Sequence, residues 1–324
     1  MLLIPEALVP ELISIEDAIA SVERSFAAFD RGQAHPYRVV RESLGHRRAV
    51  FGVKSGFDAS AGVLGLKAGG YWPENSRAGL SNHQSTILLF DPDTGRPSAL
   101  IGANHLTGVR TGAASAIAIR HLARQDATTL ALIGAGAQAI HQVRAALAAR
   151  PLRRVIAWAP SATHVESLGQ QVRALGLDFT QAATAEQAVR AADILVTVTP
   201  STAAIVMKNW VRPGTHISAM GADTVGKQEL APELIATARV VVDSVEQALT
   251  IGECQHAFRL GLLGRDDLTQ TLGGLASGRL RGRRADDEIT VFDSTGIALQ
   301  DLAPAAVAAA RARQRGLGIE VAFS

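Results

Sequence analysis

Small residues at a fixed spacing, Gly134, Gly136 and Ala139, connect two segments of different pattern. The apolar run before them, 129–133, is typical of a buried strand, and the segment after them, 139–150, is typical of a helix. A G-x-G-x-x-A turn between strand and helix lets the backbone approach a pyrophosphate and points a helix N-terminus at it. The alternative is a purely structural turn. The context favours a dinucleotide site, contacted by Gly134, Ala135, Gly136, Ala137 and Gln138.

The stretch 157–164, AWAPSATH, follows the next strand of this pattern and contains no acidic residue, arginine or lysine. NAD-binding chains often place Asp or Glu here for the ribose 2′-hydroxyl, and NADP-binding chains often place Arg. The absence of an arginine or lysine favours NAD but leaves NADP open. Ser161 and Thr163 are expected to contact either cofactor. We expect Thr111 to reach a cofactor phosphate. Further cofactor contacts are expected from Thr197, Val198, Thr199, Met220, Gly221, Asp293 and Ser294.

The segments around the glycine turn alternate between strand and helix patterns from about residue 123 to residue 302. This alternation predicts an α/β fold, with a doubly wound Rossmann sheet and helices on both faces. Before it, residues 38–100 form short apolar runs separated by turns, including the hairpin signal DPDTGRP. We therefore predict an α+β domain over residues 1–122, with the closing segment 303–324 packed back on it. A dinucleotide-binding domain is predicted over residues 123–302.

Composition limits the classes of function that remain. The 324 residues are 47% hydrophobic and 19% charged, with a net charge of +2, which is typical of a folded globular chain and gives no sign of a nucleic-acid partner. The N-terminal stretch lacks the basic start of a signal peptide, and no apolar run reaches the roughly 18 residues of a membrane helix. The single cysteine, Cys254, fits a reducing cytoplasm. No set of His, Cys, Asp and Glu has the spacing of a metal site.

Several segments along the chain together resemble the ornithine cyclodeaminase/μ-crystallin family. They are HPYR (35–38), the stretch from GLKAGG to RPSAL (65–100), LTGVRTGAASAIA (106–118), IGAGAQA (133–139), ADILVTVT (192–199), GADTVGKQEL (221–230) and VFDSTGIALQDLA (291–303). The combination is specific, although no single segment is. The resemblance implies an enzyme that binds NAD(P) and acts on small imino or amino acids. It also implies a homodimer that pairs through the N-terminal domain.

The resemblance assigns roles to charged residues. Arg38, Lys67 and Arg110 match the positions that hold the substrate α-carboxylate. A guanidinium can grip a carboxylate with two hydrogen bonds, and a lysine adds a point charge. Asp223 matches the catalytic acid of the cyclodeaminases, where it stabilises an iminium cation and relays a proton, and Lys67 is expected to take part in catalysis beside it. The alternative for Asp223 is a turn residue.

Other polar residues near these positions receive separate assignments. We place His83 in the substrate site, as a proton donor or a cofactor contact, with a hydrogen-bonded structural histidine as the alternative. Lys227 and Glu229, which follow Asp223 in the chain, are expected on the surface.

The strand 49–54, AVFGVK, bears on the choice of substrate. Ornithine cyclodeaminases need an acid there for the δ-amine of the substrate, and this chain has Phe51 where we expect that acid. The surrounding stretch is basic, and strand alternation places some of its bases on the face of Arg38. We assign Arg41 of this stretch to the substrate site. The alternative is a solvated strand face. If bases face the site, they suit a second substrate carboxylate, with Tyr71 adding a hydrogen bond.

The sequence therefore predicts NAD(P)H-dependent reduction of an α-imino acid to an L-amino acid, with iminosuccinate and L-aspartate as the preferred pair. Two alternatives stay open. One is a cyclodeaminase, a lyase that uses NAD catalytically. The other is a non-catalytic NAD(P)-binding protein of the μ-crystallin type.

Overall fold

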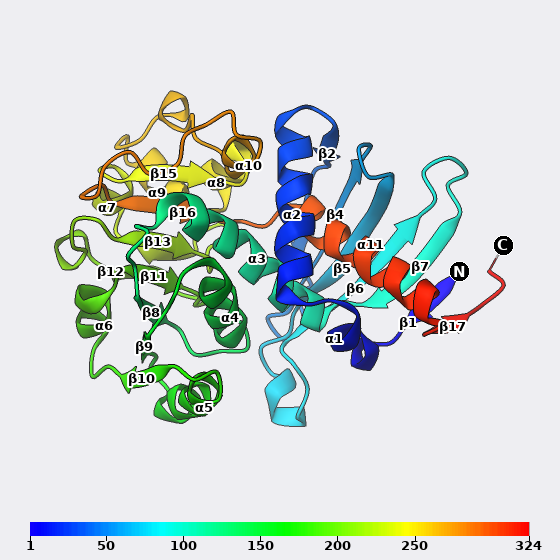
Figure 1. Cartoon of the computed structure of the whole chain (residues 1–324), viewed down its shortest axis with the longest axis horizontal. Helices are drawn as coiled ribbons and strands as arrows, with labels where there is room; N and C mark the ends of the chain where they lie inside the picture. Colours follow the sequence, from blue (N-terminus) through cyan, green and yellow to red (C-terminus); the bar gives the residue numbers. More distant parts are fainter. Residues whose placement is uncertain (324) are drawn as a thin grey trace. The chain divides into compact units, whose positions relative to one another are not determined.

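The computed structural model describes residues 1–323, except for the side chain of Ser76, as two compact units (Figure 1). The first unit contains residues 1–110 and the chain from residue 297 onward, and the second contains residues 111–296. The chain passes from one unit to the other inside helix α3 (Asn104–Leu122). The sequence placed this boundary at the end of the helix. A continuous helical pattern carries no signal for a boundary within it.

The first unit is built on an eight-stranded mixed sheet with the order β17-β1-β7-β6-β5-β4-β2, and β3 pairs with β4. Its strands are β1 (Leu2–Ile4), β2 (Ala34–Pro36), β3 (Val40–Ser43), β4 (Val50–Asp58), β5 (Val63–Tyr71), β6 (His83–Phe90), β7 (Pro97–Gly102) and β17 (Ile319–Glu320). All pairs are antiparallel except β1 with β7. The DPDTGRP segment forms the β6–β7 turn, where the Asp91 amide donates to the Arg96 carbonyl at 2.8 Å.

Two long helices, α2 (Ile15–Asp30) and α11 (Ala298–Arg315), pack against each other and cover one face of this sheet (Figure 1). Ser14 and Asp17 form a capping box that fixes the start of α2. Asp17 also pairs with Arg311 of α11, with 2.6 Å between Oδ2 and Nη1. Short elements complete the unit: η1 (Glu6–Leu8), α1 (Val9–Leu12) and η2 (Asn75–Ala78).

The second unit contains the predicted doubly wound parallel sheet, with the order β10-β9-β8-β11-β13-β16-β15. Its strands are β8 (Thr129–Ile133), β9 (Arg154–Trp158), β10 (Asp178–Gln181), β11 (Ile194–Thr197), β13 (His216–Ala219), β15 (Arg239–Val242) and β16 (Thr290–Asp293). The strand order reverses between β8 and β11, the position at which open α/β sheets bind ligands at the carboxyl ends of their strands. The α/β prediction is confirmed.

Helices and a small ribbon surround this sheet. They are α4 (Ala139–Ala149), α5 (Ala162–Arg173), α6 (Ala185–Ala191), α7 (Pro232–Ile235), α8 (Val245–Thr250), α9 (Cys254–Arg259), α10 (Leu272–Ala276), η3 (Lys208–Trp210), η4 (Arg265–Asp267), and the strands β12 (Thr202–Val206) and β14 (Gln228–Leu230). The sheet strands read as continuous apolar runs because both faces are covered, and Leu195, Ile217 and Val291 are fully buried among them. Among the residues described, no helix is both long and apolar enough to cross a membrane.

Candidate active site

The strand register of the first unit places most of the predicted substrate residues on one face of the sheet. Lys67 lies directly opposite Lys54, and Tyr71 lies opposite His83. Directly opposed residues share a face, and so do residues two apart on one strand. Helix α11 packs on this face, which we call the α11 face, because Asp301 on α11 contacts Lys67.

Arg41 belongs to the same face. Arg41 on β3 lies opposite Gly52 on β4, and Gly52 lies opposite Gly69 on β5. Gly52 is two residues from Lys54, and Gly69 is two residues from Lys67, so all of them share the face. The two glycines therefore leave part of the α11 face without side chains between Arg41 and Lys67.

The register corrects the interpretation of Phe51. Phe51 lies opposite Glu42 and Gly70, on the face away from Lys67, and its side chain is exposed. The sequence pattern fixed the strand but not its phase, and a one-residue shift exchanges the two faces. The residue of this strand that faces the anchors is Lys54, three positions further on, and it is a cation.

Lys67 and Arg110 converge on one carboxylate. The Lys67 Nζ lies 3.1 Å from Oδ1 of Asp301 and donates to the Thr107 hydroxyl at 2.6 Å. The Arg110 Nε lies 2.8 Å from the same Oδ1, and its Nη1 donates to Oε1 of Gln300 at 2.8 Å. All five side chains are buried. The structure thus brings together two of the three predicted carboxylate anchors.

Neither Gln300 nor Asp301 is among the site residues predicted from the sequence. Both lie in the first turn of α11, within the segment VFDSTGIALQDLA that contributed to the family resemblance. A signal was present, because an Asp and a Gln interrupt an otherwise apolar stretch at positions that a packed helix buries.

The electrostatics of this cluster are dominated by burial and by excess positive charge. Burial lowers the pKa of Lys67 to about 8; the Asp301 carboxylate opposes that shift, while Arg110 and Lys54 add to it. Burial opposes ionisation of Asp301, but the charges of Arg110, Lys67 and Lys54 hold its pKa below the ordinary value. Burial, with the charges of Lys67 and Arg110, lowers the pKa of His83 to about 4. His83 is therefore neutral at neutral pH.

Arg38 and Tyr71 lie nearer the edge of this arrangement. Arg38 is exposed in the segment between β2 and β3, and within the described chain it forms no hydrogen bond or ion pair with Lys67 or Arg110. Tyr71 is exposed at the end of β5, and its hydroxyl accepts from Asn82 at 3.4 Å. Assignment of these two residues to the substrate site remains a prediction.

In the second unit, the predicted glycine turn joins β8 to α4. Gly134 has a φ of 111°, and a Cβ at this position would lie 2.7 Å from the Val198 carbonyl oxygen, so only glycine fits. Gly136 and Ala137 are exposed, and no side chain caps the N-terminus of α4 at Gln138. An uncapped helix N-terminus behind an exposed turn fits a pyrophosphate. Helix α5, unlike α4, has a side-chain cap, because the Ser161 hydroxyl accepts from the His164 amide. The same hydroxyl lies 2.9 Å from the Thr163 hydroxyl.

The expectation that Glu229 lies on the surface is wrong. Its side chain is fully buried and joins the ends of β11 and β13, where cofactor contacts were predicted. The carboxylate accepts from the Thr197 hydroxyl at 2.7 Å, from the Thr199 amide at 2.6 Å and from the Gly221 amide at 2.9 Å. Three donors offset the cost of burying this acid, although desolvation still raises its pKa. Glu229 therefore shapes the edge of the sheet that the cofactor is expected to contact.

Asp293, predicted to border the cofactor, is also fully buried at the end of β16. Its carboxylate accepts from the amides of Glu253 and Cys254 at 3.0 and 3.1 Å, and burial raises its pKa to about 7. These bonds direct the side chain into the protein. Ser294 is buried too, and its hydroxyl contacts Asp243 at 3.4 Å.

Asp223, the predicted acid, lies in the loop after β13 and remains partly exposed. Its Oδ1 accepts from Lys227 Nζ at 2.7 Å and from the Thr224 hydroxyl at 3.1 Å. The carboxylate of Asp223 is thus held by two donors from its own loop. Lys227 therefore contacts the predicted catalytic residue.

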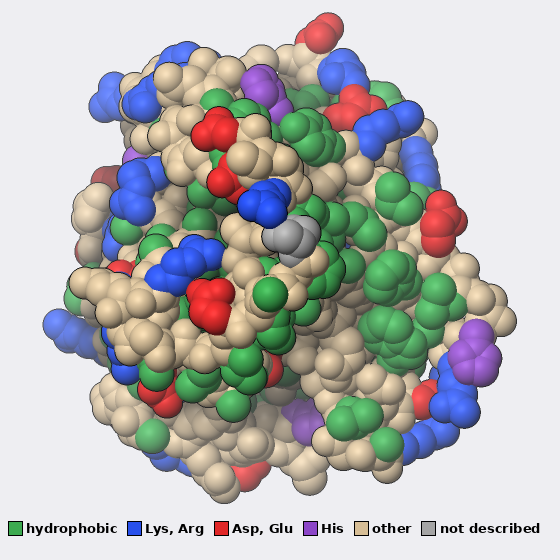
Figure 2. Space-filling model, turned by 90° about the vertical axis from the view of Figure 1, so that its right-hand side faces the viewer, with side chains coloured by type: hydrophobic (Ala, Val, Ile, Leu, Met, Phe, Trp, Pro, Cys, Tyr) green, Lys and Arg blue, Asp and Glu red, His purple; other side chains and the backbone are tan. Residues whose placement is uncertain are grey.

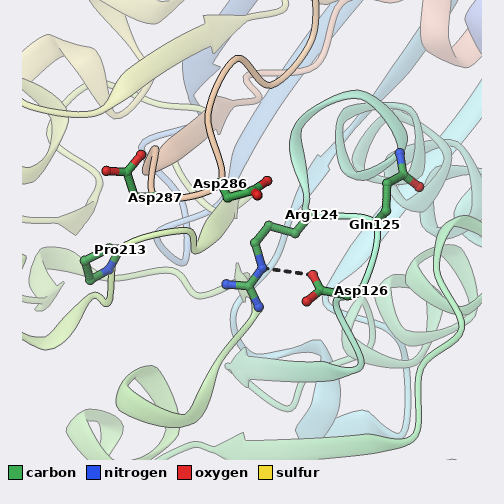
Figure 3. Close-up of a pocket in the computed structure, with 6 residues that line it drawn as sticks. All are labelled: Arg124, Gln125, Asp126, Pro213, Asp286 and Asp287. Carbon is green, nitrogen blue, oxygen red and sulfur yellow. Dashed lines mark hydrogen bonds and ion pairs between the residues drawn. The ribbon is translucent and has the colours of Figure 1, made fainter.

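A hollow in the second unit, drawn in Figure 3, lies away from this edge of the sheet. Its lining consists of Arg124, Gln125, Asp126, Pro213, Asp286 and Asp287. These residues precede β8, β13 and β16, so they lie at the amino ends of the strands, opposite the ligand-binding edge. Arg124 and Asp126 are paired across it at 3.0 Å. Among the described residues, no group of His, Cys, Asp and Glu is arranged to hold a metal ion.

A Rossmann sheet with this turn, in a chain whose other unit carries a buried cationic cluster, defines the class of two-unit, dinucleotide-dependent oxidoreductases. The chain belongs to the ornithine cyclodeaminase/mu-crystallin family, whose model matches residues 3–316.

Solved structures and curated relatives agree with this assignment. The chain is 46% identical to the iminosuccinate reductase of Paracoccus denitrificans, over 99% of both sequences. The structure of that enzyme in complex with NAD+ has a TM-score of 0.94 and covers 100% of this chain and 99% of that one.

Two further relatives cover the full length. The Thermococcus litoralis Δ1-pyrroline-2-carboxylate reductase, in complex with NADH and L-proline, is 30% identical, with a TM-score of 0.96 over 99% of this chain and 100% of that one. The Archaeoglobus fulgidus alanine dehydrogenase is 36% identical over 99% of this chain and 98% of its own.

Proposed function

We propose that the protein catalyses the NADH-dependent reduction of an α-imino dicarboxylic acid, iminosuccinate, to L-aspartate. Relatives named for reduction of an imine, or for oxidation of the corresponding amine, support the reaction type. The 46% identity with an iminosuccinate reductase supports this substrate. Complexes of relatives with NAD+ or NADH support NAD as the cofactor.

The observation that carries the diacid is the charge of the α11 face. Lys54, Lys67 and Arg110 bring three cations to the carboxylate of Asp301. Arg41 adds a further cation on the same face, beyond the two glycines. Cations at two places on one face suit a ligand that carries two carboxylates.

In this proposal, the residues of the first unit bind and orient the substrate. Arg110 and Lys67 hold the α-carboxylate, and Lys54 and Arg41 hold the distal carboxylate over Gly52 and Gly69. A protonated Lys67 is needed for this grip, and its pKa of about 8 keeps it mostly charged at neutral pH. His83, neutral at that pH, offers a hydrogen bond without adding charge.

The second unit binds the cofactor and handles the proton. The turn Gly134–Gln138 and the N-terminus of α4 hold the pyrophosphate, and the Glu229-ordered ends of β11 and β13 border the nicotinamide. When bound, NADH supplies the hydride that the imine carbon accepts. Asp223, paired with Lys227, stabilises the protonated imine nitrogen. The product amine retains that proton, so each turnover consumes one NADH and one proton.

The basic face argues against a cyclodeaminase acting on a diamine. Such a substrate carries a second ammonium, and the residue of β4 that faces the anchors is the cation Lys54. Like charges in a partly buried site repel by several kcal/mol. A member that only binds NAD(P) has no need of a buried anchor cluster together with Asp223.

The exposed face of the first unit bears on the quaternary structure. The face of the sheet opposite α11 carries Phe51, Val53, Leu66, Leu88 and Leu100, and Phe51 and Leu100 are exposed. Figure 2 shows hydrophobic side chains exposed beside one another on the side that carries this unit. We propose that a second copy of the chain covers this face, as in a homodimer. We also propose a cytoplasmic location, since the one thiol is buried and unpaired.

The experiment that tests the function follows NADH absorbance at about 340 nm. The protein is mixed with NADH, ammonia and one of four carbonyl or imine compounds: oxaloacetate, pyruvate, glyoxylate or a cyclic ketimine. Oxidation with oxaloacetate that depends on ammonia is the expected result. Preference for pyruvate or a cyclic ketimine would contradict the diacid while keeping imine reduction. No oxidation with any of them would contradict the proposed reaction.

A further inference from the structure

We infer that Asp301 is a positioning residue, whose single oxygen Oδ1 holds Lys67 and Arg110 in the geometry that receives the substrate carboxylate. The inference rests on the proposed function for the identity of the substrate, but not for the contacts themselves. It assigns a role to the first turn of α11, an element that neither the sequence motifs nor the anchor positions had connected with the reaction.

The geometry places one acceptor between two donors from different elements. Lys67 on β5 lies 3.1 Å from Oδ1, and Arg110 on α3 lies 2.8 Å from it. Each cation has a second fixed contact, to Thr107 and Gln300 respectively. Nε of Arg110 is therefore held in an ion pair with Asp301, and Nη1 in a hydrogen bond to Gln300. The direction of the guanidinium is set before a ligand arrives, which lowers the cost of binding.

The other polar atoms of these two side chains show that the arrangement is incomplete within the described chain. Oδ2 of Asp301 and Nε2 of Gln300 are buried and have no hydrogen-bond partner there. Natural proteins leave few buried polar atoms unpaired, and such atoms concentrate where a ligand or a water completes the network. Gln300 Nε2 is a donor next to a predicted carboxylate site, so a substrate carboxylate can satisfy it.

Charge is the second part of the role. The groups that act on Lys67 come from four elements: Lys54 on β4, His83 on β6, Arg110 on α3 and Asp301 on α11. Of these, Asp301 alone carries negative charge. Without it, Lys54 and Arg110 would favour the neutral form of Lys67, and the anchor would lose its charge at physiological pH.

The test compares Asp301→Asn with Asp301→Glu. The asparagine keeps the size but loses the charge, so we expect succinate, a dicarboxylate of constant charge above pH 7, to bind about tenfold more weakly as a competitive inhibitor. The pH above which succinate binding weakens should also fall by about one unit or more relative to the parent protein. The glutamate variant keeps the charge but moves it, so its binding should weaken without that shift in pH.

A matched control is Asp17→Asn, which removes another carboxylate that pairs with α11. It should lower the melting temperature while leaving the pH profile of succinate binding unchanged. If Asp301 had only a structural role, Asp301→Asn would likewise lower the melting temperature without changing the pH profile of succinate binding. The same pH profile for Asp301→Asn and the parent protein would therefore overturn the inference.

A second measurement needs no substrate. Lysines of the full chain are isotopically labelled, the Lys67 signal is assigned with Lys67→Arg, and its titration is followed by NMR. Asp301→Asn should lower the pKa of Lys67, and an unchanged titration would refute the positioning role. If Asp301→Asn does not fold, Asp301→Glu replaces it. For this variant, an unchanged Lys67 titration with weaker succinate binding supports the inference. Succinate binding by Asp301→Glu that equals that of the parent contradicts it. Because no turnover is needed, this result stands even if the proposed reaction fails.

Discussion

Arg110 differs from Lys67, which is equally buried, because its two contacts need a planar guanidinium group. Its Nε and Nη1 contact Asp301 and Gln300, which leaves the remaining edge for a ligand. A lysine keeps the charge but cannot make these contacts together. We predict that Arg110→Lys lowers kcat/KM about 100-fold or more, a loss of roughly 3 kcal/mol of transition-state stabilisation. NADH affinity, measured by fluorescence titration, should stay within about threefold. A variant with parent-like kcat/KM would remove Arg110 from the anchors.

Lys67 gives the site a pH dependence whose sign is fixed by its charge. The ammonium exists below its pKa of about 8 and is lost above it, so carboxylate binding weakens as the pH rises. We predict that the inhibition constant of succinate is constant from pH 7 to about pH 8 and then rises, approaching tenfold per unit. His83 adds no step there, because burial holds its pKa near 4.

The control for this profile is Lys67→Arg, which stays charged over the whole range. Its succinate binding should be weaker at pH 7 but flat up to pH 9. A rise near pH 8 that persists in this variant would assign the titration to another group.

At the scale of the elements, the ends of β11 and β13 are held together by Glu229, and Gly221 leaves the space for it. A Cβ at residue 221 would collide with the Thr199 carbonyl oxygen and the Glu229 carboxylate. We predict that Gly221→Ala costs about 1–3 kcal/mol of stability by overpacking and weakens NADH binding by about tenfold or more. Thermal unfolding and NADH titration check the two effects.

The matched control for Gly221→Ala is Glu229→Gln, which preserves shape but replaces one acceptor oxygen with a donor. Facing three donors, the amide must leave at least one of them unpaired, at a cost of roughly 1–3 kcal/mol. Both variants should therefore affect the same edge. If NADH binding is unchanged in both Gly221→Ala and Glu229→Gln, the ends of β11 and β13 do not belong to the cofactor site.

The sequence predicts elements well where local chemistry defines them. Ser14 predicts the start of α2, and the alternation of strand and helix patterns predicts the parallel sheet. The Asp, Pro and Gly residues of the segment between β6 and β7 predict the turn. The phase of β4 was not predictable, because its residues include Gly52 and Gly56 and its apolar side chains do not alternate clearly. Phe51, expected at the position of the missing acid, therefore lies on the face away from the anchors, and Lys54 lies opposite Lys67.

Residues that act across long separations were also missed. Asp301 lies 234 positions from Lys67, and Glu229 lies 32 positions from Thr197. Neither pair has a local signature, and a charged residue in isolation is more often exposed than buried. The three-dimensional fold is needed to recognise that these acids bind internal donors.

At the scale of the whole molecule, the first unit has one face covered by α2 and α11 and the other face rich in apolar side chains. Leu66, Leu88 and Leu100 lie directly opposite one another across β5, β6 and β7 on that second face. Exposed apolar patches of this kind mark interaction sites.

We therefore predict that light scattering gives twice the mass of the chain for the parent protein and that Leu88→Lys reduces it to one chain. A lysine in the centre of this face must lose its hydration to be covered, which costs several kcal/mol, whereas in the monomer it stays in water. Leu260→Lys is the matched control, because Leu260 is 65% exposed and lies in the second unit. It should leave the mass at two chains.

A parent protein with the mass of one chain would contradict the dimer. A Leu88→Lys variant that remains a dimer would place the interface on another surface. Because the anchors lie on the opposite face of the same sheet, a monomeric variant that still binds succinate would show that the two faces act independently.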